Sequence, residues 1–298
     1  YAVGLEGLAL GERAYQQALG FARERVQGRA IEGSAGSVAI IKHPDIRRML
    51  LLMRAQNEAM RAVAYSVAAA WDIAVKHPDA EERARRQAFV DLMIPVVKAW
   101  LTETGNEVTS LGVQIHGGMG FIEETGAAQH FRDARITTIY EGTTGIQALD
   151  LIGRKVARDG GAALNTLLGQ MEETQADVAK QSTGSFKTIA DVLNKGIQAV
   201  TAASEYIVAN YSKDVRTVAV GAVPFLRLLG IVSGGWMMAR AALAAQAKID
   251  AGDKDAFYLA KINTAHFYAD HVMVAASGLA KEVVQGGASA LALDDAYF

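Results

Sequence analysis

A single carboxylate, Glu141, lies in the segment Ile-Thr-Thr-Ile-Tyr-Glu-Gly-Thr-Thr-Gly-Ile-Gln (136–147), between two regions with a helical pattern. Apolar flanks would hold this carboxylate away from water and raise its pKa, as a proton-abstracting base requires. Gly142, directly after it, would let a ligand approach the backbone closely. The same pattern fits a glutamate at a helix N-terminus that the helix dipole stabilises. The segment therefore predicts either a general base or a residue that only begins a helix.

A glycine-rich segment, Gln-Ile-His-Gly-Gly-Met-Gly-Phe (114–121), is the second candidate for chemistry. Glycines such as Gly117 and Gly118 expose backbone N–H groups that can hold an anion, for example a pyrophosphate. The Gln114 amide can donate and accept hydrogen bonds at once. A plain turn between two helices is the alternative. Since no strand precedes the segment, it is not the dinucleotide fingerprint of a Rossmann fold.

Arg25 lies near the end of the first predicted helix, where the helix dipole favours a cation without any ligand. The functional alternative is a bidentate contact between its guanidinium and a phosphate. The histidines lack the spacing of a metal site: His116 and His130 are too far apart for one turn, and no acidic cluster joins His266 and His271. We therefore expect no metal ion.

Charge and composition limit the class of protein. The 298 residues carry 30 Lys and Arg against 32 Asp and Glu, so no basic excess indicates a nucleic-acid binder. The chain has no cysteine, which excludes disulfides and suits a reducing compartment, and we expect a cytoplasmic protein. The weakly charged run 217–248 is interrupted by Arg227 and Arg240. The uncharged span between them is about half of the roughly 20 residues that cross a bilayer, so membrane association is not expected.

The elements that would position these residues are helices throughout. Apolar residues recur at helical spacing and no alternating strand pattern occurs, so the expected fold class is all-α. Short connections between helices are typical of an antiparallel bundle. The predicted helices cover residues 5–27, 43–75, 80–111, 123–129, 142–159, 162–180, 186–212, 216–250 and 256–286, with glycine-rich connectors at 28–42 and 112–121.

The pair Gly160-Gly161 is the predicted boundary between two helical-bundle domains, residues 1–159 and 160–298. All the candidate site residues fall in the first of them. Five methionines at helical spacing are expected to fill the core rather than to form a cofactor surface: Met49, Met53, Met60, Met237 and Met238. The chain begins at Tyr1 within a helical pattern and without an initiator methionine, so we expect it to be part of a longer protein.

Three motifs, in this order and at this spacing, resemble the C-terminal helical domain of the acyl-CoA dehydrogenases. They are Ala-Arg-Glu-Arg-Val-Gln (22–27), the glycine-rich segment 114–121, and Ile-Tyr-Glu-Gly-Thr (139–143), which Arg-Asp-Ala-Arg-Ile (132–136) precedes. This resemblance covers about residues 1–157 and implies a four-helix bundle. Residues 160–298 resemble the extra helical domain of a larger subgroup that includes the 3-methylthiopropionyl-CoA dehydrogenase-like proteins.

The resemblance implies a reaction and a cofactor. Glu141 would remove the α-proton of an acyl-CoA thioester while the β-hydrogen leaves as hydride to FAD, giving a trans-2-enoyl-CoA. Thr143 would contact the flavin. Four residues would contact the pyrophosphate and adenine of FAD, often that of a neighbouring subunit: Arg25, Gln114, Gly117 and Gly118. The family also implies a homodimer or homotetramer, and an electron-transfer flavoprotein or similar acceptor as redox partner.

A helical oligomerisation or interaction module without a catalytic site of its own is the alternative function. Apolar faces that other domains would otherwise cover favour association. By itself the chain is expected to be inactive, because the family places most contacts to the flavin ring on a β-domain that has no counterpart in this sequence.

Overall fold

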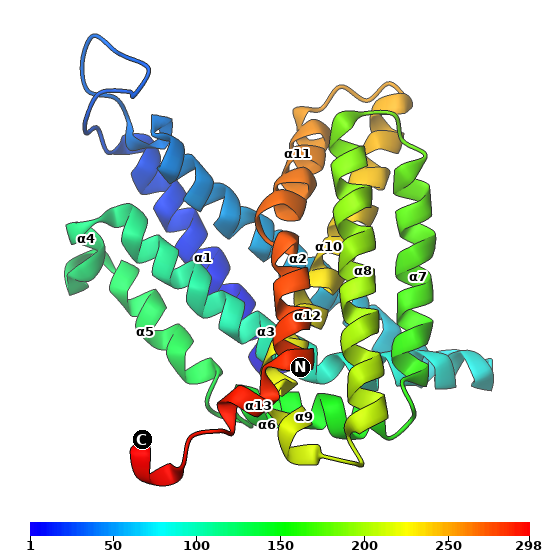
Figure 1. Ribbon diagram of the computed structural model, residues 1–298. Coiled ribbons are helices and arrows are strands. Elements are labelled where there is room, and N and C mark those ends of the chain that lie inside the picture. The colour runs from blue at the N-terminus through cyan, green and yellow to red at the C-terminus, as the bar shows by residue number, and fades with distance from the viewer.

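The structure is a computed structural model that describes all 298 residues, and it is built from helices without a β-sheet (Figure 1). The one strand-like pairing is an isolated antiparallel bridge between Val26 and Ala39. The all-α prediction is confirmed. The helices form two groups that lie side by side.

The first group contains the motifs singled out in the sequence. Its long helices are α1 (Ala2–Glu24), α2 (Pro44–Lys76), α3 (Ala80–His116) and α5 (Ala127–Thr137), with short α4 (Gly118–Phe121) and α6 (Thr144–Asp150). Helices α1 and α3 approach closely because glycines face each other at the crossing. A Cβ on Gly7 would lie 2.8 Å from the Leu101 carbonyl oxygen, and a Cβ on Gly105 would lie 2.5 Å from that of Gly7.

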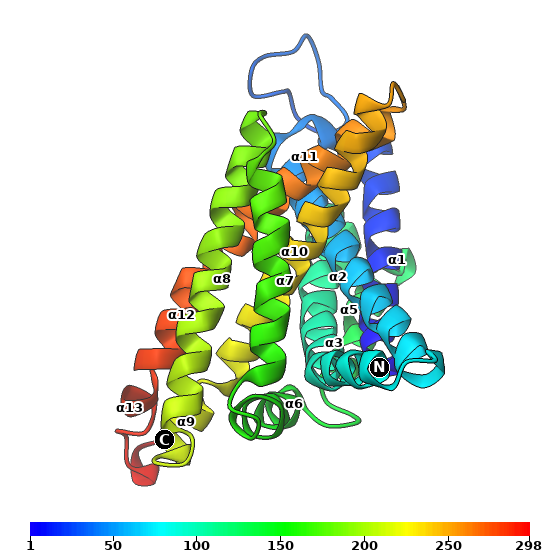
Figure 2. The same cartoon turned by 90° about the vertical axis from the view of Figure 1, so that its right-hand side faces the viewer.

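The second group packs around one central helix. Its elements are a π-helical turn η3 (Leu151–Ala157), α7 (Ala162–Ala179), α8 (Gly184–Asn210), α9 (Val215–Val220), α10 (Ala222–Asp250), α11 (Ala256–His271), α12 (Ala276–Gln285) and α13 (Gly287–Ala290). Figures 1 and 2 show α10 between α7 and α8 on one side and α2 and α3 on the other. Short 3₁₀ turns cover Ile40–Lys42, Glu123–Thr125, Met273–Ala275 and Asp295–Tyr297.

One large hydrophobic core runs through both groups, from Leu8 in α1 to Val283 in α12. The Trp100 ring of α3 lies against α10, and an ion pair of 2.5 Å joins Glu58 of α2 to Lys261 of α11. A smaller hydrophobic cluster lies between the C-terminal ends of α1 and α3 and the N-terminal end of α2. The five methionines predicted to be core residues are all buried. The division at Gly160-Gly161 stays a prediction, since the core is continuous across it.

Helix α10 is long and apolar enough to cross a membrane by length and composition alone. Its most apolar window has a mean hydropathy of 1.4, but 83 % of that window is buried inside the protein. A central core helix therefore accounts for its composition.

Several helix bounds differ from the prediction for local reasons. Helix α1 ends at Glu24 rather than near Gly28, because residues after it pair with the returning chain: Gln27 N–H donates to the Val38 carbonyl at 3.0 Å. Helix α3 continues through Gly112 to His116, since Gly112 packs against the Ala14 methyl, and it ends at Gly117 with φ 60°.

Other differences concern segments that were predicted as single or shorter helices. The predicted helix 123–129 is a 3₁₀ turn followed, after Gly126 at φ 77°, by α5, which runs eight residues further to Thr137. The predicted helix 216–250 is divided at Gly221, where a Cβ would meet Val283 backbone atoms at 3.1 Å. The predicted helix 256–286 is divided at Val272 by a 3₁₀ turn.

Candidate functional site

The turn that joins α5 to α6 contains Glu141, and its backbone is unusual. Glu141 has φ 54° and Gly142 has φ 92°, so two consecutive residues are left-handed. Glu141 is the one residue other than glycine with positive φ in the chain. Such a conformation costs of the order of 1 kcal/mol and persists where surrounding contacts impose it. An outlier of this kind makes Glu141 a candidate for a functional role.

Contacts from three helices impose this backbone. The Thr144 N–H donates to the Thr138 carbonyl at 3.2 Å and closes the turn. The Thr144 hydroxyl donates to Glu103 of α3 at 2.5 Å, and the Tyr140 hydroxyl donates to Glu6 of α1. The Gln147 amide of α6 donates to the Glu141 carbonyl oxygen at 3.2 Å. The turn is therefore fastened to α1, α3 and α6.

Thr143, not Glu141, begins α6. Its hydroxyl accepts from the Ile146 N–H at 3.4 Å and caps the helix. Glu141 lies two residues before this cap and outside the first helical turn, so the helix-start role offered as the structural alternative belongs to Thr143. This leaves the Glu141 carboxylate without a structural task that the contacts reveal.

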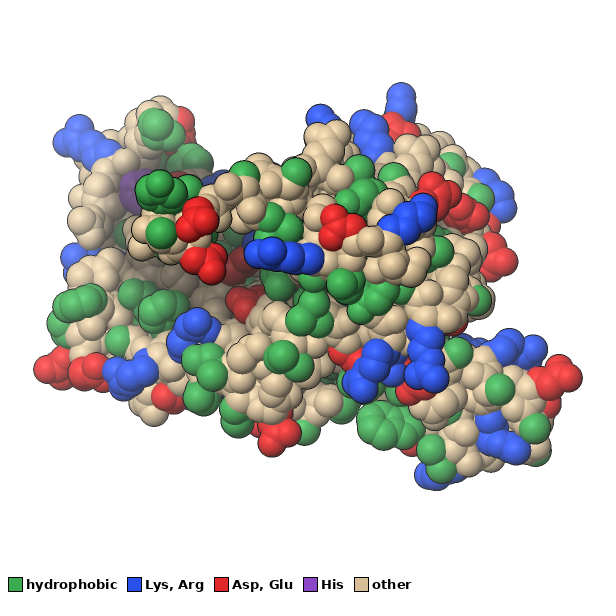
Figure 3. All heavy atoms as spheres, turned by 60° about the horizontal axis from the view of Figure 1, so that its bottom comes forward, with side chains coloured by type: hydrophobic (Ala, Val, Ile, Leu, Met, Phe, Trp, Pro, Cys, Tyr) green, Lys and Arg blue, Asp and Glu red, His purple; other side chains and the backbone are tan.

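The prediction of a dry carboxylate is wrong for this chain by itself, because Glu141 is exposed. The apolar neighbours expected to enclose it are themselves open: Ile139 is 47 % and Ile146 is 59 % exposed. Hydrophobic side chains lie between charged ones over the lower face of the molecule, which Figure 3 brings forward. Six large exposed ones lie on α5, in the turn itself and on α6: Phe131, Ile136, Ile139, Tyr140, Ile146 and Leu149. Whatever covers this face would also enclose Glu141.

A second candidate site is an open cavity of about 710 Å³ between the end of α1, the following loop and the end of α3. Three predicted residues, Arg25, Gly117 and Gly118, line it together. Its other lining residues are Phe21, Gln27, Gly28, Ile40, His43, Ile46, Ile115, His116 and Met119. Gln114, the fourth residue predicted with them, is exposed on α3 and outside this lining.

The geometry of the cavity suits an anion. Arg25 is extended and exposed, its guanidinium donates to the Gln27 side-chain oxygen at 3.3 Å, and no carboxylate lies within ion-pair distance of it. A Cβ on Gly117 or Gly118 would meet nothing within 4 Å, so the space over this backbone is open to a ligand. Gly120 differs, since a Cβ there would overlap the Val113 carbonyl. Unpaired guanidinium and open backbone together fit the phosphates of a dinucleotide.

Two histidines that the sequence analysis did not assign to this site line the cavity. The His43 Nε2–H donates to the Gln27 carbonyl at 2.7 Å, and the His116 Nδ1–H donates to the Gly112 carbonyl at 2.7 Å. The carbonyl partners set these tautomers. The His116 ring also stacks on Phe21, with 4.5 Å between ring centroids. His43 directly precedes α2 and lies 16 positions after Gln27, outside every motif, so only the fold brings it here.

The two candidate sites lie at opposite ends of the first group. The Glu141 turn is fastened to Glu6, near the start of α1, whereas Arg25 follows the end of that helix. At 1.5 Å per residue this separation is roughly 28 Å along α1. Figure 1 shows the same arrangement, with the α5–α6 turn at the bottom and α4 on the left. One chain therefore does not bring Glu141 and Gly117 together.

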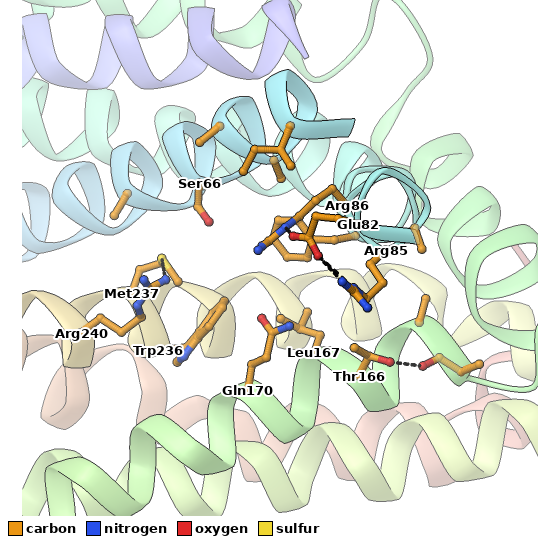
Figure 4. Close-up of a pocket in the computed structure, with 18 of the residues that line it drawn as sticks. Ser66, Glu82, Arg85, Arg86, Thr166, Leu167, Gln170, Trp236, Met237 and Arg240 are labelled. Carbon is orange, nitrogen blue, oxygen red and sulfur yellow. Dashed lines mark hydrogen bonds and ion pairs between the residues drawn. The ribbon is translucent and has the colours of Figure 1, made fainter. Parts of the chain in front are cut away.

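A larger cavity of about 850 Å³ lies between the two groups, walled by α2, α3, α7 and α10 (Figure 4). Arg85 and Arg86 share the Glu82 carboxylate at 2.5 and 2.6 Å. Arg240 lies over the Trp236 ring, 5.3 Å from its centroid. No predicted site residue lines this cavity. Its lining residues come from helices that are far apart in sequence, so no sequence motif indicates it. No group of three or more His, Asp or Glu side chains in the chain could hold a metal ion.

Comparison with protein-family models matches nearly the whole chain. Residues 1–157 match the model described as "Acyl-CoA dehydrogenase, C-terminal domain", and residues 167–294 match "Acetyl-CoA dehydrogenase C-terminal like". The first match contains every predicted site residue.

Two curated relatives match nearly the full length of the chain but only about half of their own. The chain is 46 % identical to 3-methylmercaptopropionyl-CoA dehydrogenase of Ruegeria pomeroyi, covering 98 % of this chain and 49 % of the relative. It is 34 % identical to the broad-specificity linear acyl-CoA dehydrogenase FadE5 of Mycobacterium tuberculosis, covering 99 % and 50 %. The chain thus spans about half the length of the curated relatives it matches.

The fold is shared with solved structures. An acyl-CoA dehydrogenase complexed with FAD from Bacillus anthracis superimposes with a TM-score of 0.73 at 19 % identity, covering 96 % of this chain and 48 % of the other. Both groups of helices are therefore part of one known arrangement.

Proposed function

Because this chain belongs to the acyl-CoA dehydrogenase family, as its motifs suggested, we propose that it is the C-terminal half of an FAD-dependent acyl-CoA dehydrogenase. The substrate is an acyl-CoA thioester and the product is a trans-2-enoyl-CoA. The observation that carries the proposal is the Glu141 turn, which holds an exposed carboxylate in a left-handed conformation with no structural task.

Glu141 acts as the general base in this proposal. Its carboxylate accepts the α-proton of the thioester, and the turn fixes the direction from which it approaches. Bound FAD supplies the acceptor for the β-hydrogen and two electrons. Thr143, two residues after the base, would contact the flavin through its hydroxyl, which also accepts from the Ile146 N–H. In the intact protein, other parts of the assembly would cover the apolar face around the turn, exclude water from it and strengthen the charge interactions of the Glu141 carboxylate.

Arg25, Gly117 and Gly118 hold the phosphates of FAD in this proposal, with Gln114 at the margin. The open backbone over the glycines and the unpaired guanidinium support this role. Because the cavity lies roughly 28 Å from the Glu141 turn, it serves the FAD of a neighbouring subunit. A homodimer, or a homotetramer of two such dimers, follows from this division of the sites.

Replacing Arg25 by Met in the intact protein is expected to weaken FAD binding by about 10- to 150-fold. A charge-assisted hydrogen bond to phosphate contributes about 1.5–3 kcal/mol, which corresponds to this range. FAD release during dilution, followed by flavin fluorescence, measures the change. Arg29→Met is the matched control, since Arg29 is exposed nearby but does not line the cavity. Equal FAD affinity in the two variants would contradict the assignment.

The proposed function is tested with the intact protein carrying FAD. Under anaerobic conditions, at least one member of a panel of acyl-CoA thioesters is expected to bleach the oxidised flavin absorbance and to yield the 2-enoyl-CoA. A protein that binds FAD but is reduced by no member of the panel would disprove it.

A helical interaction module is the second candidate, and the exposed apolar face around the Glu141 turn favours it. It predicts an intact protein that assembles but purifies without flavin, so gel filtration with a visible spectrum separates the two functions.

Within the first proposal, the reduced flavin passes its electrons to an electron-transfer flavoprotein or a similar acceptor, and the protein is cytoplasmic.

A further inference from the structure

A buried lysine of α3 lies beneath the Glu141 turn. Lys98 is only 3 % exposed, and its ammonium donates to the Thr137 carbonyl at 2.9 Å. No carboxylate lies within 4 Å of it, so it forms no ion pair. An ammonium removed from water costs several kcal/mol unless other groups compensate it. Other contacts must therefore stabilise the buried Lys98 ammonium.

Thr137 is the last residue of α5, so its carbonyl is one of those that the helix leaves without a partner. A cation at this end is favoured by the helix dipole. Asn106, on the same side of α3, donates to the Ala134 carbonyl at 2.9 Å. Side chains of α3 thus fix the end of α5, and with it the point where the turn to Glu141 begins.

The charged groups around the turn come from α1, α3 and α5. Besides Lys98, they are Glu103 on α3, Glu6 on α1, which accepts from Tyr140, and Arg135 on α5, which donates to Thr138. Burial lowers the pKa of Lys98, while the carboxylates of Glu103 and Glu141 act in the opposite direction.

We propose that Lys98 is a positioning residue for Glu141: it fastens the start of the turn through the Thr137 carbonyl and so fixes the place from which the carboxylate meets the substrate. This inference rests on the proposed function, since the position of the Glu141 carboxylate matters for the reaction only if Glu141 is the base. A lysine that only capped α5 would stabilise that helix without affecting the rate of flavin reduction.

Hydrogen exchange tests the fastening without any catalytic readout. In the intact protein, Lys98→Met keeps an apolar stem but loses both the donor and the charge, and Lys98→Arg keeps both. Amides of residues 138–144 are expected to exchange at least several-fold faster in Lys98→Met than in the wild type, with Lys98→Arg in between. Lys187→Met, an exposed lysine on α8, is the control and should leave these amides unchanged. Unchanged exchange in Lys98→Met would overturn the proposal.

Single-turnover reduction of the flavin by an acyl-CoA tests the positioning. A misplaced base removes the α-proton more slowly, so Lys98→Met should reduce its bound FAD at least about 10-fold more slowly than the wild type. Lys98→Arg should recover most of the wild-type rate. Asn106→Ala removes the second contact between α3 and the end of α5 and should also slow reduction, which tests the proposal should Lys98→Met fail to fold.

Wild-type rates of flavin reduction in both Lys98→Met and Asn106→Ala would overturn the positioning role, whatever the exchange rates. A wild-type protein that no acyl-CoA reduces would instead disprove the proposed function. In that case, faster exchange in Lys98→Met would still show that Lys98 fastens the turn, so the two failures are distinguishable.

Discussion

Replacing Glu141 by Gln in the intact protein is expected to slow flavin reduction by an acyl-CoA by about 10²- to 10⁴-fold, the usual contribution of a positioned general base. The amide has nearly the shape of the carboxylate but cannot accept the α-proton. The turn should survive the change, because its hydrogen bonds involve the Glu141 backbone and neighbouring side chains, not the carboxylate. FAD should remain bound, since the cavity lined by Arg25 and Gly117 lies at the other end of α1.

Two measurements separate loss of the base from loss of the fold. Single-turnover reduction of the flavin gives the rate, and exchange of the substrate α-proton with deuterated solvent reports proton removal directly. Glu172→Gln, an exposed glutamate on α7, is the control and should behave as the wild type. Glu141→Gln protein that reduces its flavin at an undiminished rate would remove Glu141 from the mechanism.

Residues of the two candidate sites could be proposed from the sequence alone where they lie next to each other in short motifs. Glu141 to Thr143 and Gly117-Gly118 are each defined by a few adjacent positions, so their local chemistry could be read directly. The exposure of Glu141 could not be predicted, because apolar residues next to a carboxylate in sequence keep water from it only when other residues pack over them. Here Ile139 and Ile146 point to an uncovered face.

Residues that join the sites only through tertiary packing were missed. Lys98 lies 43 positions before Glu141, and its burial depends on how α5 crosses α3. His43 reaches the Arg25 cavity because a bridge between Val26 and Ala39 turns the chain back. Neither contact leaves a periodic signal, since one polar residue within a helical pattern looks the same whether it faces solvent or another helix.

The helices themselves followed from periodicity, but their interruptions did not. Gly112 lies within α3, Gly221 divides α9 from α10, and Gly230 lies in the middle of α10. The sequence shows the same residue type in all three positions. What differs is the neighbour that each missing side chain would meet, and this is a property of the fold.

Gly230→Ala is expected to lower the free energy of unfolding by at least about 2 kcal/mol, the largest stability effect that we predict. A Cβ at this position would overlap the Trp100 ring, with Cδ1 and Cδ2 of the indole both 2.7 Å away. The ring cannot easily withdraw, because it is buried and also lies against Gly234, 2.9 Å from the position of a Cβ there. Overpacking of a core costs about 1–3 kcal/mol and sometimes more.

Gly169→Ala is the matched control, because it is also a glycine within a helix but a Cβ there meets nothing within 4 Å. Alanine favours a helix over glycine by about 1 kcal/mol, so this variant should be slightly more stable than the wild type. The same gain is present in Gly230→Ala, and the clash with Trp100 must exceed it to produce the expected loss. Denaturant unfolding of the intact protein measures both variants. If Gly230→Ala were as stable as Gly169→Ala, α10 would not be held against α3 by close contact, and the single core shared by the two groups of helices would be looser than the structure shows.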